Sequence, residues 1–276
     1  MQTQFKLETI KEQETPTTGD RVYSHAHMHY LEDKIIGKNQ INYYKQFRSI
    51  LGIVLYIALQ TRPDIMYAVI RLTREQTTPK WGTYQDLLHI VGYLKHTSSL
   101  GILFTGDWLN DSNIPRLNLF TDASYADVKD GKQSSVGHIL YLGKDIISYY
   151  ASATKNVVRS TCEAELYSLD VGVMDSYNIQ RFIQELCQLK DTIPTHVHCD
   201  NQAAIHVLIK NKQHKGLKHT DISIAYLREK FVERKYRLFH VATNDNVADI
   251  FTKALFTPKF KDMRNKLFNI NYLKTF

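Results

Sequence analysis

The sequence predicts an α/β fold in which helices flank a mixed sheet, preceded by a small helical bundle. Three observations predict it. Apolar residues recur every three or four positions between Tyr44 and His96. Strand-like runs begin at Arg116, and from there strand and helix patterns alternate along the chain. The chain of 276 residues, 43% of them hydrophobic, is long enough for one large domain or two modest ones.

Residues 1–40 are polar and are predicted to form an irregular tail or linker. The stretch "TPTTGD" is typical of turns. His25, His27 and His29 alternate and could ligate a metal from a strand. No fourth ligand follows at the spacing of a zinc site, which favours a solvated polar tail instead.

Residues 41–108 are predicted to form a helical segment. The run "YKQFRSILGIVLYIALQT" is the first helix, "RPD" breaks it, and "DIMYAVIRLTREQ" and "KWGTYQDLLHIVGYLKHT" follow as the second and third. The run "SLGILFTGDW" then predicts a strand. Basic and aromatic side chains of the bundle suggest a surface for nucleic acid, against the alternative of a solvated helix face. They are Lys45, Arg48, Arg62, Arg71, Arg74, Lys80, Lys95, Trp81 and Tyr84.

Residues 112–256 are predicted to form the sheet domain, in the order βββ-αα-β-αα-β-α. Its strands are "RLNLFTD", "VGHILYLG", "DIISYYAS", "THVHCD" and "RLFHVAT", and its last helix is "DNVADIFTKAL". Residues 257–276 are predicted to form a basic C-terminal tail.

Charge and cysteine content narrow the class of protein. The net charge of +7 suits a polyanionic partner, although many unrelated proteins share such an excess. The three cysteines form no CxxC pair, which predicts reduced thiols in an intracellular protein. No apolar run reaches the roughly 18 residues of a membrane span, so we expect no membrane association.

Four acidic residues stand at or near the ends of predicted elements. Asp122 and Asp200 end strands, and Glu165 and Asp249 lie in helices. Strand ends and adjacent helices can meet at one edge of a sheet, where four carboxylates would repel one another unless cations lay between them. Oxygen ligands suit Mg²⁺ or Mn²⁺, and two such ions can stabilise a phosphodiester displacement. Each acid could equally be a helix cap or a solvated side chain, and spacing alone leaves both interpretations open.

A resemblance to a known family favours the interpretation of these acids as metal ligands. The stretches "TDASYADVKDGKQSSVG", "STCEAELYSL", "HCDNQAAI", "KHTDISIAYLREK" and "NVADIFTKAL" resemble, in order, the ribonuclease H region of copia-type LTR retrotransposon Pol polyproteins. The upstream "YKQFRSILGIVLYIALQTRPDI" is similar to the segment that joins polymerase to ribonuclease H in this family. The resemblance covers roughly residues 44–255.

The resemblance implies a ribonuclease H-like fold, a thumb- or connection-like segment before it, and two Mg²⁺ or Mn²⁺ ions held by catalytic acids. The matching acids are Asp122, Glu165, Asp200 and Asp249. Glu163 competes with Glu165, but residues two apart on a helix point about 200° from each other, and the family pattern selects Glu165. Four further positions are implied to bind the RNA–DNA hybrid, in part through its minor groove. They are Ser124, Tyr125, Asn201 and Gln202.

The implied function is endonucleolytic hydrolysis of the RNA strand of RNA–DNA hybrids, in the cytoplasm (within virus-like particles) or the nucleus. The implied partners are the hybrid and the palm and fingers domains of the remaining Pol. The sequence contains no Y-x-D-D pair, so we expect no polymerase active site in it. Two alternatives are a non-catalytic hybrid-binding remnant and an integrase-type strand-transferase. The motif Lys218–Asp221 fits either substrate contact or the start of a helix.

Overall fold

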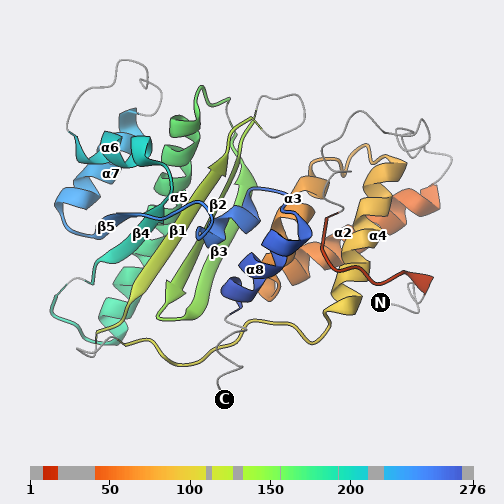
Figure 1. The fold of residues 1–276 in the computed structure, drawn as a ribbon, viewed down its shortest axis with the longest axis horizontal. Coiled ribbons are helices and arrows are strands. Elements are labelled where there is room, and N and C mark those ends of the chain that lie inside the picture. Colours follow the sequence, from red (N-terminus) through yellow and green to blue (C-terminus); the bar gives the residue numbers. More distant parts are fainter. Residues whose placement is uncertain are drawn as a thin grey trace. The chain divides into compact units, whose positions relative to one another are not determined.

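The structure of the chain is a computed structural model. It describes residues 9–17, 41–109, 114–126, 133–155, 157–191, 193–210 and 221–268. His25, His27 and His29, and Lys218 to Thr220, lie outside these ranges. The chain divides into two compact units (Figure 1). Unit 1 comprises Met1–Ile102 and Ala254–Asn265, and unit 2 comprises Leu103–Lys253 and Lys266–Phe276.

Unit 1 is the predicted helical bundle. Its elements are α2 (Ile41–Gln60), the short 3-10 helix η5 (Pro63–Ile65), α3 (Met66–Thr73), α4 (Trp81–His96) and α8 (Thr257–Leu267) up to Asn265. The apolar residues that recur every three or four positions form the core of this unit, in which Phe47, Ile50 and Leu87 are fully buried. Phe260 of α8 completes it against Tyr93, so a segment expected to be a basic tail adds apolar contacts to the bundle.

A buried ion pair joins the break between α2 and α3 to the end of α4. The Arg62 guanidinium donates to both carboxylate oxygens of Asp64, at 2.9 and 2.8 Å. It also donates to the Thr97 carbonyl and hydroxyl oxygens, and the Tyr93 hydroxyl donates to Asp64 at 2.6 Å. Arg62 is only 4% exposed, and Tyr84 only 8%. Both were expected on a nucleic-acid surface, and that expectation is wrong for these two residues.

Unit 2 is built on a five-stranded sheet with the order β3-β2-β1-β4-β5. The strands are β1 (Leu117–Ser124), β2 (Ser135–Leu142), β3 (Asp145–Ala153), β4 (Thr195–Cys199) and β5 (Tyr236–His240). The first three pair antiparallel, whereas β4 lies parallel to β1 and β5 parallel to β4. This mixed sheet with flanking helices confirms the predicted fold class.

One long helix, α5 (Thr161–Leu186), lies along one face of the sheet, where two helices were predicted (Figure 1). Gly172 lies within this helix where it packs on the sheet. A Cβ there would lie 3.1 Å from Thr121 Cγ2 and 3.2 Å from Leu119 Cδ2, so the glycine allows close packing on β1 rather than a break. The core between α5 and the sheet contains Leu119, Leu166 and Val197.

Two further expectations about secondary structure are wrong. Residues 99–108 form no strand. Part of this segment instead wraps around the Asp145 carboxylate, which accepts hydrogen bonds from Thr105, Gly106 and Trp108. The last predicted helix, residues 245–255, is the 3-10 helix η6 (Val247–Phe251), followed by an irregular turn before α8.

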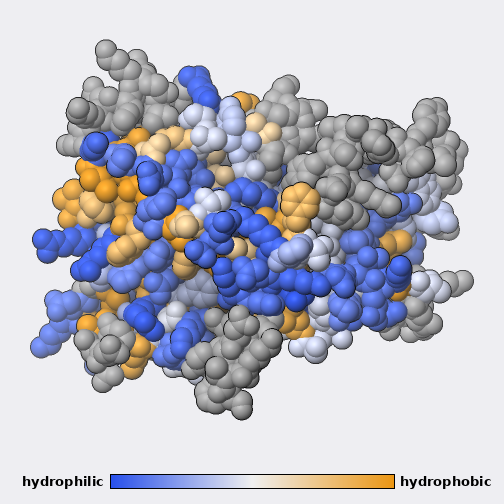
Figure 2. All heavy atoms as spheres, in the orientation of Figure 1, coloured by the Kyte–Doolittle hydropathy of each residue, from blue (hydrophilic) through white to orange (hydrophobic). Residues whose placement is uncertain are grey.

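The short helices α6 (Gln202–Ile209) and α7 (Asp221–Val232) form an outer layer of unit 2. Leu208 and Leu227 face the core, whereas Ile209, Ile222 and Val232 are 52%, 87% and 78% exposed. Figure 2 shows apolar atoms gathered over this layer. Among the helices of the described residues, none is long and apolar enough to cross a membrane.

Candidate metal centre

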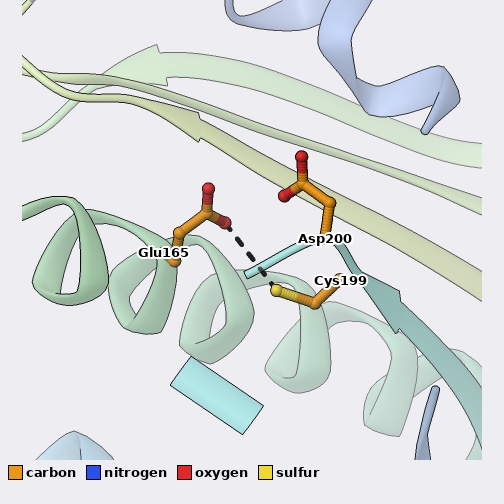
Figure 3. Close-up of side chains that lie close together, drawn as sticks. All are labelled: Glu165, Cys199 and Asp200. Carbon is orange, nitrogen blue, oxygen red and sulfur yellow. Dashed lines mark hydrogen bonds between the residues drawn. The ribbon is translucent and has the colours of Figure 1, made fainter. Parts of the chain in front are cut away.

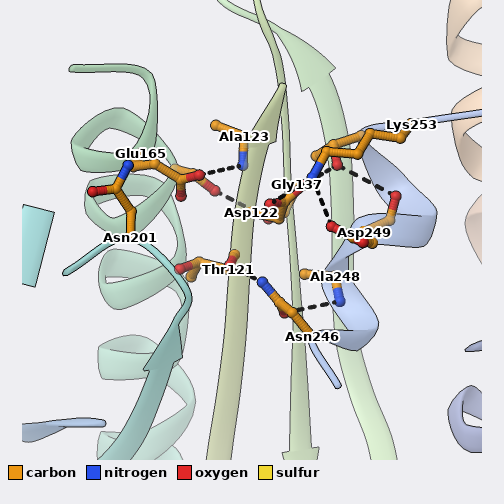
Figure 4. A network of polar contacts seen from close by, with 12 residues as sticks. Thr121, Asp122, Ala123, Gly137, Glu165, Asn201, Asn246, Ala248, Asp249 and Lys253 are labelled. Atoms are coloured by element: carbon orange, nitrogen blue, oxygen red, sulfur yellow. Dashed lines mark hydrogen bonds and ion pairs between the residues drawn. The ribbon is translucent and has the colours of Figure 1, made fainter. Parts of the chain in front are cut away.

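The structure brings the four predicted acids together within unit 2. Asp122 lies near the end of β1, Asp200 directly follows β4, Glu165 lies in the first turns of α5, and Asp249 lies in η6. Because β1 and β4 are adjacent and parallel, their C-terminal ends meet at the same edge of the sheet. The helices α5 and η6 then bring Glu165 and Asp249 to that edge from either side of β1 (Figure 4).

Two overlapping groups of side chains have ligand atoms close enough to share a cation. One oxygen each of Asp122, Asp200 and Asp249 lies within 4.8 Å of the others, and so do atoms of Glu165, Cys199 and Asp200. Asp200 belongs to both groups. Figure 3 shows Glu165 and Asp200 pointing toward one another above the Cys199 thiol.

Burial and the crowding of acids raise the pKa values of two of the carboxyl groups. Burial, followed by the charges of Asp249 and Asp200, raises the pKa of Asp122 from 3.8 to about 6, although Lys253 and Thr252 oppose the rise. The pKa of Glu165 is also raised well above its ordinary value, by burial and then by Asp122 and Asp200. Acids with raised pKa values that face one another are typical of functional sites rather than of surface charges.

A lysine and a threonine from the turn after η6 complete the site. Lys253 Nζ lies 2.7 Å from Asp249 Oδ1 and 3.2 Å from Asp122 Oδ2. The Thr252 hydroxyl donates a hydrogen bond to Asp122 Oδ2. The backbone N–H of Ala123 donates to Glu165 Oε1 at 3.3 Å. All of these donors stabilise ionised carboxylates, so the chain itself partly offsets their repulsion.

The position of η6 depends on a buried asparagine. Asn246 is 0% exposed; its side-chain nitrogen donates to the Thr121 carbonyl oxygen at 2.9 Å, and its side-chain oxygen accepts from Ala248 N–H. It therefore caps η6 and fastens it to the strand residue beside Asp122. This contact joins residues that are distant in sequence, so no local pattern predicts it.

Gly137 of β2 also positions η6. A Cβ at this residue would lie 2.4 Å from Phe251 Cβ, closer than two carbon atoms can approach. We therefore expect Gly137→Ala to push η6 off the sheet, lower the free energy of unfolding by about 1–3 kcal/mol, and weaken Mn²⁺ binding because Asp249 moves. Urea denaturation and Mn²⁺ titration measure the two effects.

The control for this prediction is Gly52→Ala. No atom lies within 4 Å of a Cβ built at that helical position, so alanine should leave Mn²⁺ binding unchanged and hold or raise stability. Equal behaviour of the two variants would show that η6 is not held by its contact with Gly137.

Glu163, the competitor of Glu165, has a different function in the structure. Its backbone N–H donates to the hydroxyl oxygen of Ser160, the N-cap of α5, and its carboxylate accepts from Arg159 N–H at 2.6 Å. These contacts form a capping arrangement at the start of the helix. The carboxylate of Glu163 is thus occupied by the backbone, while that of Glu165 faces Asp200.

The residues predicted to bind substrate surround the carboxylates. Ser124 ends β1, and the neighbouring Tyr125 is 42% exposed. Asn201 is the N-cap of α6, where its side-chain oxygen accepts from Ala204 N–H, and Gln202 is the first residue of that helix and exposed. The capping contact gives Asn201 a structural function, whatever else it binds.

Sequence reasoning missed four residues of this site: Cys199, Asn246, Thr252 and Lys253. All four lie within the motifs "HCDNQAAI" and "NVADIFTKAL", and Lys253 also follows Asp249 by four residues, the spacing at which side chains on a helical turn meet. Cys199 lies under Glu165, with its sulfur 3.9 Å from Glu165 Oε2. Burial raises the pKa of its thiol, which keeps it neutral beside the acids.

Comparison with known proteins gives the sequence relationship. No family model matches the chain. It is 34% identical, over 222 residues, to the retrovirus-related Pol polyprotein from transposon RE1 of Arabidopsis thaliana. It is 30% identical, over 216 residues, to that from transposon TNT 1-94 of Nicotiana tabacum. The chain is a homologue of copia-type retrotransposon Pol polyproteins.

The chain spans only a small part of the length of these relatives. The match to the Arabidopsis protein includes 80% of this chain but 15% of the relative, and the match to the tobacco protein includes 78% and 16%. Among solved structures, an RNase H1 in complex with RNA/DNA hybrid is 16% identical, covers 50% of this chain and 94% of its own, and gives a TM-score of 0.37. An N-terminal RNase H domain from Mycobacterium tuberculosis is 14% identical, covers 56% of this chain and 98% of its own, and also gives 0.37.

Proposed function

We propose that this chain is a metal-dependent nuclease of the ribonuclease H type that hydrolyses the RNA strand of RNA–DNA hybrids. The observation that supports it is the convergence of Asp122, Glu165, Asp200 and Asp249 at one edge of the sheet. These are the acids that the resemblance to Pol polyproteins selects. The relatives of the chain are Pol polyproteins of retrotransposons, and the motifs that carry these acids resemble the ribonuclease H region of such polyproteins.

The donor set fits divalent cations of the Mg²⁺ and Mn²⁺ class. Asp122, Asp200 and Asp249 offer carboxylate oxygens within 4.8 Å of one another, which is the hard ligand type that these ions prefer. Asp122 and Asp249 already hold a cationic group, the Lys253 ammonium. Two ions would be held by the four acids together, and when bound they would stabilise the charge that develops on the phosphate oxygens.

The chain's own side chains orient this site. Thr252 and Ala123 hold Asp122 and Glu165 through hydrogen bonds, and Asn246 fixes η6 and thereby Asp249. Exposed Tyr125 and Gln202 lie beside the acids and are available to contact the hybrid. Discrimination of RNA from DNA would then depend on 2′-hydroxyl contacts in the minor groove.

The alternatives explain less of the geometry. An integrase-type strand-transferase does not explain why Glu165 and Asp249 both lie at the edge of the sheet where Asp122 and Asp200 end their strands. A non-catalytic hybrid-binding remnant would not need the ligand atoms of these acids to lie close enough to share a cation.

The test is a cleavage assay with the full chain, comparing an RNA–DNA hybrid, single-stranded RNA and duplex DNA of one sequence. We expect cleavage of the RNA strand of the hybrid only, dependent on Mg²⁺ or Mn²⁺ and lost with chelator. Hybrid binding without cleavage would favour the remnant. Equal cleavage of all three substrates would show a different nuclease.

A further inference from the structure

Lys253 occupies an unusual position among the acids. Its ammonium lies within hydrogen-bond distance of both Asp249, at 2.7 Å, and Asp122, at 3.3 Å (Figure 4). The side chains of these acids are 0% and 1% exposed, whereas that of Lys253 is 33% exposed. The ammonium therefore lies between two buried carboxylates and solvent.

The lysine ammonium and a divalent cation need the same oxygen atoms. The ammonium contacts Asp249 Oδ1 and both oxygens of Asp122. A Mg²⁺ ion would bind such oxygens at about 2.0–2.1 Å, and two positive groups that close would repel each other strongly. The two cations are therefore expected to exclude one another.

The lysine side chain is able to leave. It has a flexible four-carbon stem, and its side chain, on the turn after η6, is partly exposed. The Asp122 and Asp249 side chains, by contrast, are buried. Exchange of the cation therefore needs rotation of one partly exposed side chain and no rearrangement of the fold.

We propose that Lys253 is a resident counter-cation of the metal centre: it keeps Asp122 and Asp249 together before metal binds and is displaced when a divalent cation takes their oxygens. This inference rests on the proposed function only in assuming that a divalent cation binds these acids. Lys253 is thus a positioning residue that sets the metal affinity of the site. Removing its charge should tighten metal binding and destabilise the metal-free fold.

The experiment compares the full chain with Lys253→Met and Lys253→Arg. Binding of Mn²⁺ is measured by electron paramagnetic resonance, and unfolding by urea in chelator. We expect Lys253→Met to bind Mn²⁺ at least about tenfold more tightly and to unfold at lower urea concentration. Lys253→Arg keeps the charge and should bind Mn²⁺ as the wild type does.

The matched control is Lys230→Met. Lys230 also contacts two carboxylates, of Glu229 at 2.9 Å and Glu233 at 3.0 Å, but on α7 outside the metal centre. This variant should leave Mn²⁺ affinity unchanged. A second measurement follows the Lys253 13Cε resonance, assigned by its absence in Lys253→Met, during a Mg²⁺ titration. Displacement predicts that it moves to the position of a solvated lysine as the site fills.

The outcomes separate failure of the counter-cation proposal from failure of the nuclease proposal. Equal Mn²⁺ affinity of wild type and Lys253→Met, or a 13Cε resonance that stays in place at saturating Mg²⁺, would overturn the counter-cation and leave the nuclease proposal standing. Weaker binding by Lys253→Met would overturn it as well. Binding by Lys253→Met alone would support it strongly, and absence of binding by both proteins would overturn both proposals.

Discussion

Asp122→Asn is expected to abolish Mg²⁺-dependent cleavage of the hybrid while leaving hybrid binding measurable. Asp122 lies at the centre of the site, where its carboxylate contacts Thr252 and Lys253 and neighbours Asp200 and Asp249. Asparagine keeps the shape of the side chain but removes the charge that a cation requires. Loss of several kcal/mol of transition-state stabilisation corresponds to roughly a thousandfold or more in rate. Single-turnover cleavage kinetics measure it.

The fold of this variant should survive. Because the folded-state pKa of Asp122 is raised from 3.8 to about 6, its ionised form is disfavoured by folding. Wild-type stability is therefore lost as pH rises from 3.8 through about 6, and the full loss is present at pH 7. In chelator, Asp122→Asn should match or exceed wild-type stability at pH 7, and this advantage should shrink as pH falls below about 6.

Glu163→Gln is the control on the same helix as Glu165. Its side chain accepts a hydrogen bond from Arg159 N–H at the start of α5, and glutamine can serve in the same capping position. Cleavage should therefore remain near the wild-type rate. If Asp122→Asn retained wild-type turnover with Mg²⁺, or if Glu163→Gln lost it, the assignment of the four acids would be wrong.

The sequence predicts the sheet and its acids better than the contacts that hold them. Strand-like runs and family motifs indicate Asp122 and Asp200 at strand ends, and the structure places both at one edge. Their function as metal ligands stays a prediction. Asn246 lies in the motif "NVADIFTKAL", but its contact could not be predicted, because its partner, the Thr121 carbonyl, lies 125 residues away.

The wrong predictions from the sequence also arise from contacts between residues that are distant in the chain. The run "SLGILFTGDW" has the composition of a strand, but Asp145 satisfies its backbone and indole donors. Two helices were predicted where α5 is continuous, and this helix packs closely on β1 through Gly172. Arg62 and Tyr84 belong to residue types that usually reach solvent, and both are buried by partners on other elements. In each case a long-range contact overrides the local pattern.

Asp64→Ala is expected to destabilise the helical unit more than any other single change proposed for it. The substitution leaves the Arg62 guanidinium, 4% exposed, without its carboxylate, and the Tyr93 hydroxyl loses its acceptor at 2.6 Å. Breaking a buried ion pair by removing one partner costs about 3–5 kcal/mol, because the remaining charge stays buried. Hydrogen exchange of the α2, α3 and α4 amides, read by mass spectrometry in the full chain, measures the loss.

Two comparisons test whether the unpaired charge of Arg62 causes the loss of stability. The double variant Arg62→Met with Asp64→Leu removes both charges and should recover most of the protection, since apolar replacements of buried ion pairs are often close to neutral. Glu233→Gln removes a partner of Lys230 at the surface, just after α7, and should change stability little. If Asp64→Ala cost no more than Glu233→Gln, the Arg62–Asp64 pair would not hold the bundle. If the double variant were as unstable as Asp64→Ala, the hydrogen bonds to Thr97 and Tyr93, rather than the unpaired charge, would carry the stability of this unit.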